Sequence, residues 1–350
     1  MRTFGAPWIL LLYCSAGFGQ QSACGVPVNV LVPDLSWLQS PHVPPASPFS
    51  DRRLAIPSVP LSFGNFDAAL GALRLPNWTL ARNLPAGAFL AYDRKRQVSV
   101  RSITIEGAPR RIVFVVENSI KMTSAGRRVA ATVMSDILSK GRPGDSFALL
   151  TAGGPTRELP FGSSREALLS AADGLRNPPQ GQGNERGVLD AVVQAVDWLQ
   201  PPQAGDSIFL MAMHLEGKSN VSFGKARATL AAGPIRLFGF QFGSPELDYT
   251  GNPIGWVERS VQMFALSRES GGVAVLEDTE KGRQYQLANG RLEELRNNAQ
   301  QMYSAVTNYY ALQLDSISPH LRIELSPATK GKLGVAIVLY PWFPRECTRR

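Results

Sequence analysis

A continuous apolar run at residues 112–116 (Ile-Val-Phe-Val-Val) constrains the fold of this chain more than any other feature. Consecutive apolar residues without alternation are typical of a parallel strand that is buried on both faces. A helical spacing of apolar residues follows the run, and Gly141 and Pro143 end it. A buried strand followed by a helix predicts an α/β fold, in which the crossover places the next strand parallel to the first.

The same alternation continues to residue 276. Further apolar runs predict strands at 146–151, 207–213, 235–242 and 273–276, with a short edge strand at 158–161. Helical spacing predicts helices between them, one of which starts with a capping box of Ser163 and Glu166 and another of which ends at Gly271-Gly272. We therefore predict an α/β fold class with a Rossmann-like, doubly wound, mainly parallel sheet.

Two β-rich stretches flank this series. Prolines exclude long helices between residues 24 and 108, where short β-like runs occur, and one helix and three strand-like runs follow the series. We divide the chain into a signal peptide at 1–19, a β-rich segment at 24–108, an α/β domain at 109–280, and a helix with strands at 281–347. Our hypothesis is that the two flanking stretches pack together as a sandwich-like module.

The first nineteen residues are typical of a Sec-type signal peptide. They contain Arg2, an apolar core at 7–13, and small residues before a cleavage site after Gly19. No later stretch approaches the roughly 18 apolar residues of a transmembrane helix. We expect a soluble, secreted or periplasmic protein.

Removal of the signal peptide leaves two cysteines, Cys24 and Cys347, at opposite ends of the chain. Two cysteines in an exported protein favour a disulfide, which would bring the termini together. Lipidation of Cys24 is the alternative. Ala23 suits lipidation, whereas Gln21 stands where an aliphatic residue is expected.

Conventional catalytic motifs are absent from the sequence. The glycine-rich stretch 181–187 has one residue too many for a dinucleotide loop and follows prolines, not a strand. The three histidines, His42, His214 and His320, accompany no nucleophile motif. The lysines and arginines behind the net charge of +8 are scattered, without a long basic run. We predict neither an enzyme nor a nucleic-acid-binding protein.

Two loops at the predicted carboxyl edge of the sheet contain the remaining candidate functional residues. One has the sequence Glu117-Asn118-Ser119-Ile120-Lys121-Met122, and the other contains Glu216-Gly217. With the element order of residues 111–276, these loops resemble the von Willebrand factor A domain, whose first strand ends in Asp-x-Ser-x-Ser-Met and whose fourth ends in Asp-Gly. Residues 83–93 and 305–314 resemble flanking segments in a family of exported acidobacterial proteins. The resemblance implies a binding module that holds a divalent cation in its relatives.

This chain departs from the family's metal motif at several positions. Glu117 and Glu216 replace the two aspartates, Lys121 replaces the second serine, Arg186 takes the place of a threonine, and Ser119 matches. Mg²⁺ requires compact octahedral oxygen coordination at about 2.0–2.1 Å, so longer acids and inward cations oppose it. Our hypothesis is that an ion-pair cluster of the four charged residues replaces the metal and that no cofactor binds.

Two alternatives stay open for the cations of this edge. Lys121 and Arg186 either extend to solvent or bind a partner's carboxylate directly. On either interpretation we expect a non-catalytic protein-binding or adhesion-type module, whose partner is an unknown protein or an envelope component. A structural subunit of a cell-envelope assembly is the alternative, and a hydrolase using Glu117 and Glu216 is a third. The sequence assigns no role to the proline-rich loop at 34–60.

Overall fold

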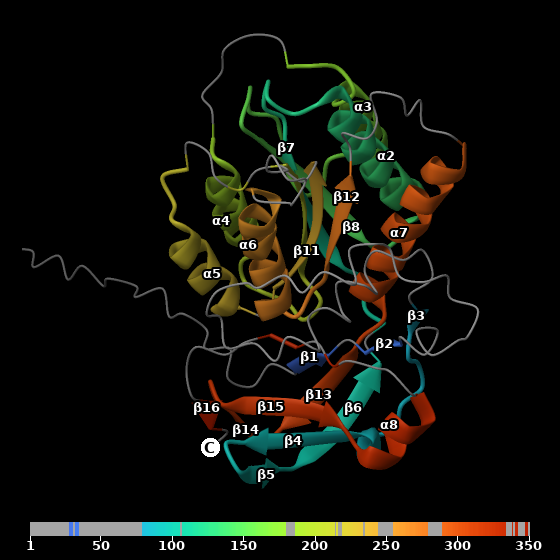
Figure 1. Cartoon of the computed structure of the whole chain (residues 1–350), viewed down its shortest axis with the longest axis vertical. Helices are drawn as coiled ribbons and strands as arrows, with labels where there is room; N and C mark the ends of the chain where they lie inside the picture. Colours follow the sequence, from blue (N-terminus) through green and yellow to red (C-terminus); the bar gives the residue numbers. More distant parts are fainter. Residues whose placement is uncertain are drawn as a thin grey trace, which may run out of the picture.

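A computed structural model shows an α/β domain stacked on a smaller module made of β-strands (Figure 1). The structure describes residues 28–30, 32–34, 79–105, 107–179, 186–213, 215, 219–233, 235–243, 255–278, 289–333, 338, 340–341 and 347–348. We call the described residues 28–34, 79–105 and 310–348 the β module.

The α/β domain is built on a six-stranded sheet in the order β12-β11-β10-β7-β8-β9. Its strands are β7 (Arg111–Glu117), β8 (Ser146–Ala152), β9 (Glu158–Leu159), β10 (Ser207–Ala212), β11 (Arg236–Gly243) and β12 (Ala274–Asp278). Every neighbouring pair is parallel except β8 and β9. The predicted class, a doubly wound and mainly parallel sheet with flanking antiparallel strands, is confirmed.

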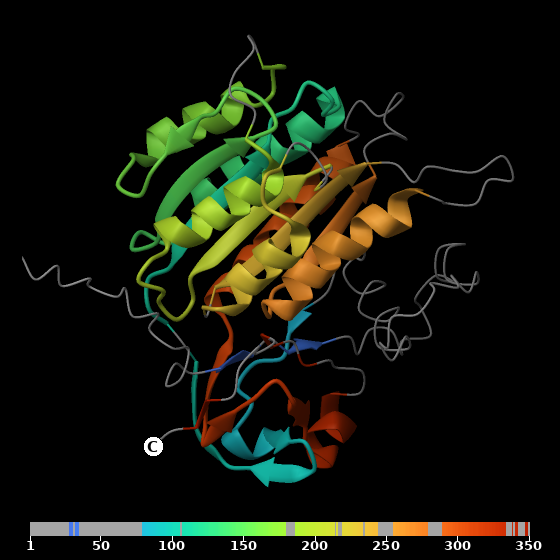
Figure 2. The ribbon, with the colours of Figure 1, turned by 90° about the vertical axis from the view of Figure 1, so that its left-hand side faces the viewer.

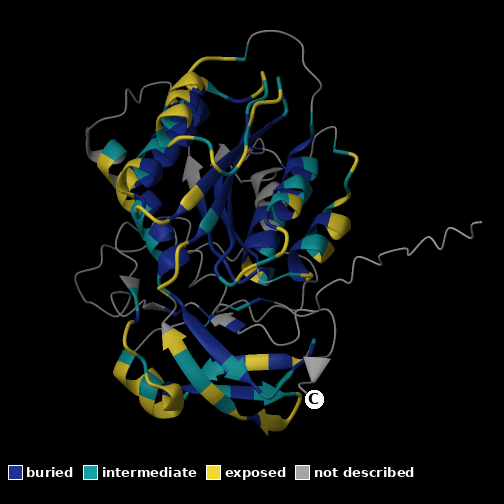
Figure 3. Ribbon diagram, turned by 180° about the vertical axis from the view of Figure 1, so that it is seen from behind, coloured by how far each residue is buried: buried dark blue, intermediate teal, exposed yellow. Residues whose placement is uncertain are grey.

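Helices cover both faces of this sheet (Figure 2). One face carries α4 (Val188–Trp198), α5 (Phe223–Ala231) and α6 (Gly255–Glu269), and the other carries α2 (Ser124–Lys140), α3 (Arg165–Gly174) and α7 (Asn289–Thr307). The central strands are therefore buried on both sides, as Figure 3 shows. On the face of α2 and α7, Phe209 lies between Phe114 and Phe238, with ring centroids 5.8 and 5.5 Å apart.

The start of α3 differs from the sequence prediction. The N-cap is Ser164, whose side chain accepts a hydrogen bond from Ala167 N, and not Ser163. Ser163 Oγ instead donates to Pro160 O at 2.7 Å and closes the preceding turn. The capping box with Glu166 was therefore wrong, because a neighbouring serine of equal capping ability fills the position.

The β module combines strands from both ends of the chain. The sheets are β1-β13-β6, β15-β4-β5, β14-β16 and β2-β3. Their strands are β1 (Val28–Val30), β2 (Pro33–Asp34), β3 (Thr79–Leu80), β4 (Phe89–Asp93), β5 (Arg96–Val98), β6 (Val100–Ile105), β13 (Tyr310–Leu314), β14 (Ser316–Ile317), β15 (Leu321–Leu325) and β16 (Cys347–Thr348), accompanied by the short helix α8 (Pro327–Leu333). β13 pairs with both β1 and β6, and β15 pairs with β4. The two ends of the chain thus share one apolar core.

Several sequence predictions lie outside the described residues. These are the signal peptide at 1–19, Cys24, all of the 34–60 loop after Asp34, and most of the strand expected at 334–340. Cys347 opens β16 opposite Ile317, and its disulfide with Cys24 stays a prediction. Among the helices that the structure describes, none has the length and apolarity to cross a membrane.

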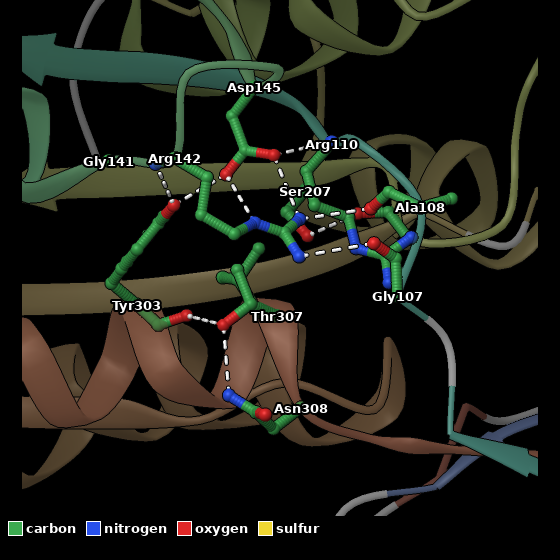
Figure 4. Close-up of polar contacts among 12 residues, drawn as sticks. Gly107, Ala108, Arg110, Gly141, Arg142, Asp145, Ser207, Tyr303, Thr307 and Asn308 are labelled. Atoms are coloured by element: carbon green, nitrogen blue, oxygen red, sulfur yellow. Dashed lines mark hydrogen bonds and ion pairs between the residues drawn. The ribbon is translucent and has the colours of Figure 1, made fainter.

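A buried carboxylate ties together three segments where the α/β domain meets the β module (Figure 4). Asp145, in the turn between α2 and β8, accepts hydrogen bonds from Arg110 N at 2.8 Å, Arg142 Nη2 at 2.8 Å and Tyr303 Oη at 2.5 Å. Burial, with the hydrogen bond to Asp145 next, raises the pKa of Tyr303 to about 12, so the phenol stays a donor at neutral pH. The start of β7 and the helix α7 are therefore fixed to one anchor.

A second buried group, Arg236 at the start of β11, holds the end of α7. Its Nη1 and Nη2 donate to Ala305 O at 3.1 Å and Val306 O at 2.8 Å, and its guanidinium lies 4.0 Å from the ring centroid of Tyr309. Burial lowers the pKa of Arg236 to about 10, so it remains protonated at neutral pH. The cation thus binds the carbonyl end of a helix, where positive charge is favourable. Tyr310, which directly follows Tyr309 in the sequence, belongs to the core of the β module.

Candidate functional site

The candidate site is formed by loops at the carboxyl edge of the sheet, which points away from the β module (Figure 1). The loops after β7 and β8 are in close contact: Asn118 N donates to Ala152 O at 2.6 Å, and a Cβ added to Gly153 would lie 2.9 Å from Ser119 Cβ. Gly153 has a φ of +77° and donates from its N to Arg186 O at 2.7 Å. Glycine is therefore required there by both backbone conformation and space.

Glu117 is the acid at the centre of this edge. It is 4% exposed, and its side chain lies at the end of β7. Its Oε1 accepts a hydrogen bond from Ser119 Oγ at 2.7 Å, and its Oε2 accepts one from Met213 N at 2.7 Å. The carboxylate therefore fixes its own loop and also joins β7 to the end of β10.

The cation beside Glu117 is Arg127, which occupies no position of the predicted metal motif. It is 3% exposed and belongs to the first turns of α2. Its Nη1 donates to Asn118 Oδ1 at 2.9 Å, and its Nη2 donates to Ser119 O. Burial lowers the pKa of Arg127, and attraction to Glu117 partly offsets that shift. A guanidinium supplied by the helix therefore organises the loop that follows β7.

The two cations predicted from the sequence, Lys121 and Arg186, are not the buried cation of this loop. The Lys121 side chain is exposed, and Arg186 Nη2 forms an ion pair with Glu158 Oε1 at 2.7 Å, on the edge strand β9. The buried cation of this loop is therefore Arg127 of α2, six residues after Lys121, and the predicted ion-pair cluster stays a prediction. Glu216 and His214 lie outside the described residues, so the part assigned to Glu216 stays a prediction.

A second acid, Asp190 of α4, closes the loop after β10. Its Oδ1 accepts from Val221 N at 2.8 Å, and its Oδ2 accepts from Asn220 N at 3.1 Å. A Cβ on Gly187 would lie 2.0 Å from Ser219 Oγ, which shows how closely this loop approaches the helix. Asp190 could have been recognised from the sequence, because it lies in the first turn of a predicted helix. Carboxylates bind exposed backbone N–H groups at that position.

One part of the edge projects to solvent. Ile120 is 77% exposed and is the one large exposed hydrophobic side chain in the described part of the chain. It is followed by the exposed Lys121, while Ser119 and Met122 on either side are held by the contacts of the buried layer. The loop therefore has a fixed base and an accessible apolar and cationic tip.

The donor set of the described residues does not fit a divalent cation. Mg²⁺ binds several uncommitted oxygens in a compact octahedron, whereas both oxygens of Glu117 already accept hydrogen bonds. The buried guanidinium of Arg127 would repel a second positive charge. Among the described residues, no three His, Cys, Asp or Glu side chains come together as metal ligands.

The comparisons with known proteins bear on the fold. No protein-family model matches the chain. No curated protein matches it. Solved structures with a similar fold include the BatB protein of Bacteroides thetaiotaomicron, at 14% identity and a TM-score of 0.39, covering 55% of this chain and 98% of that one. A von Willebrand factor type A protein of Catenulispora acidiphila matches at 10% identity and a TM-score of 0.42, covering 63% of this chain and 47% of that one.

Proximal thread matrix protein 1 of the mussel byssus is also similar, at 14% identity and a TM-score of 0.40, covering 63% of this chain and 50% of that one. This chain therefore spans about half the length of the last two proteins. With its strand order and its helices on both faces of the sheet, the α/β domain is similar in fold to these proteins. The resemblance to exported acidobacterial proteins stays a prediction.

Proposed function

We propose that the chain is an exported, secreted or periplasmic, non-catalytic protein-binding module that uses the carboxyl edge of its α/β sheet without a bound metal. The main support for this proposal is that the loop after β7 has a buried base and an exposed tip. Glu117 and Arg127 are buried beneath it, whereas Ile120 and Lys121 are exposed at its tip. A loop that is already ordered loses little conformational entropy on binding, which favours recognition by a rigid surface.

The chemistry of the tip indicates the kind of partner. An exposed isoleucine contributes apolar area, and the neighbouring ammonium group favours a carboxylate on the partner. A hydrolytic role for Glu117 is disfavoured because both of its oxygens are occupied by hydrogen bonds within the protein. We therefore propose an acidic protein surface as the ligand and no catalytic step.

Photocross-linking from position 120 in an envelope extract tests this function. We expect a defined cross-linked species that persists in EDTA, is lost in Lys121→Glu, and is kept in Lys225→Glu, an equal charge change on the exposed surface of α5. The reversed charge at position 121 would repel the partner's carboxylate, so the expected loss is at least tenfold, or about 1.4 kcal/mol.

The cross-linker placed at Ala228, which is exposed on α5, is the control for nonspecific capture. Loss of the species in EDTA would contradict the metal-free proposal. An unchanged yield in Lys121→Glu would contradict the assignment of the tip as the binding surface.

A further inference from the structure

Much of the positive charge of the chain lies in two stretches of the β module, and the remaining described stretches of the module add one acid, Asp34. Residues 79–105 and 310–333 contain eight lysines and arginines against three aspartates and glutamates, a net charge of +5, compared with +8 for all 350 residues. The cations are Arg82, Arg94, Lys95, Arg96, Arg101, Arg322, Lys330 and Lys332, and the acids are Asp93, Asp315 and Glu324. With Asp34 included, the described β module has a net charge of +4, half the net charge of the whole chain.

The three acids of these stretches are already engaged. Asp315 pairs with Arg101, Asp93 Oδ1 accepts a hydrogen bond from Ser318 Oγ at 2.6 Å, and Glu324 lies 3.9 Å from Lys330. Asp315 and Glu324 lie next to Arg101 and Lys330, and Asp93 keeps its charge beside the turn, so these stretches as a whole remain positive and attract anions.

Three of the other cations lie at the turn between β4 and β5. Arg94, Lys95 and Arg96 are consecutive and exposed, and none forms an ion pair with any residue that the structure describes. Arg322 of β15 lies beside them, with its guanidinium 5.0 Å from the ring centroid of Tyr92 on β4. We call Arg94, Lys95, Arg96 and Arg322 the basic tip.

The backbone conformation of this turn indicates that Arg94 is retained for its charge. Asp93 pairs with Arg96, so Arg94 and Lys95 form a two-residue hairpin turn, and Arg94 has a φ of 57°. Glycine or asparagine adopts that conformation with much less strain than arginine. A cation held at an unfavourable φ is better explained by a use for its charge than by the needs of the turn.

The position and shape of the basic tip favour a flat partner. The β4–β5 hairpin lies at the end of the molecule opposite the candidate site, and exposed residues cover that end (Figures 1 and 3). A projecting turn presents its cations to a plane together, whereas a single nucleic-acid strand is usually held in a groove with stacked aromatic rings.

We propose that the basic tip is an electrostatic docking surface for a bilayer that contains anionic lipids. No exposed large hydrophobic side chain lies among the described residues of the β module, so we assign the contact with the headgroups to the cations of the basic tip. Each cation near such a surface adds a similar increment of affinity, which salt screens. The proposal is independent of the function assigned to the opposite edge and leaves that edge facing away from the membrane.

Co-sedimentation of the full chain with vesicles tests this proposal. The probe is phosphatidylcholine containing about one third phosphatidylglycerol, and pure phosphatidylcholine reports any binding through the apolar N-terminal run. We expect binding to the anionic vesicles that weakens strongly with salt. The variant Arg94→Gly, Lys95→Gln and Arg96→Gln should bind more than tenfold more weakly, and the glycine suits the positive φ, so the turn should fold. Arg322→Gln, on a regular strand, should weaken binding severalfold.

The matched control is Lys140→Gln, Arg176→Gln and Lys225→Gln, which removes the same charge from the surface of the α/β domain and should bind within twofold of the unchanged chain. Equal binding of the tip variant and the unchanged chain would overturn the proposal. So would equal binding to neutral and anionic vesicles, or tip-dependent retention on DNA or an anionic polysaccharide without vesicle binding.

Discussion

Replacing Arg127 by methionine should destabilise the protein by about 3 kcal/mol, because it removes a buried charged donor from Asn118 and Ser119 and the attraction between Arg127 and Glu117. Arg127 is 3% exposed and Glu117 is 4% exposed, so water cannot replace the lost guanidinium. Asn118 Oδ1 and Ser119 O would lose their donor in the same change. The midpoint of urea unfolding, with the slope unchanged, measures this loss.

A double-mutant cycle separates the charge pair from the loss of packing. Glu117→Gln removes the negative charge while keeping a group of nearly the same shape, so Glu117→Gln in the Arg127→Met background should be less harmful than in the unchanged protein. We expect a coupling free energy of about 2 kcal/mol, within the usual range for groups of one buried network. Free energies that add within about 0.5 kcal/mol would show that Arg127 acts on the loop alone and does not stabilise Glu117.

Arg236→Met should also destabilise the protein by about 3 kcal/mol, through the junction between the two parts of the molecule. The change removes two charge-assisted hydrogen bonds to the carbonyls of Ala305 and Val306 and the stacking on Tyr309. Methionine restores some apolar packing and removes the free-energy cost of burying a charge. The decrease in the free energy of unfolding is therefore smaller than the sum of the contributions of the lost contacts. Urea unfolding monitored by circular dichroism measures it.

Two further variants test whether the loss of stability is specific to the guanidinium of Arg236. Arg236→Lys keeps the charge but loses the planar fork that reaches both carbonyls, so it should fall between the unchanged protein and Arg236→Met. Arg176→Met, at an exposed position, should change the free energy of unfolding by less than about 0.5 kcal/mol. A loss in Arg236→Met no larger than that of Arg176→Met would mean that Arg236 does not hold the end of α7.

The apolar runs predicted the parallel sheet closely because strands buried on both faces permit few other residues. The run at 112–116 lies within β7, and the strand expected at 207–213 is β10, which ends one residue earlier because Met213 N donates to Glu117. The helices α5 and α8 were not predicted. α5 buries few side chains and has a weak apolar spacing, and α8 buries none.

The sequence located Glu117 at the end of a predicted strand, where the structure has it, but did not indicate Arg127 as the buried cation of the same loop. Lys121 was selected because it occupies a motif position, whereas Arg127 reaches the same loop from another element. Long side chains connect elements in ways that spacing within a motif does not report. A signal did exist, since Arg127 lies three and seven residues before Ala130 and Met134, on the buried stripe of α2. An arginine on an apolar stripe requires a buried partner.

Calorimetric titration of the full chain with Mg²⁺ and Mn²⁺ tests most directly whether a guanidinium has replaced the metal at this edge. We expect heats no larger than those of dilution up to millimolar concentrations, both for the unchanged protein and for Glu117→Gln. Micromolar binding by the unchanged protein that disappears in Glu117→Gln would contradict it, because Glu117 would then be a metal ligand and not the partner of Arg127.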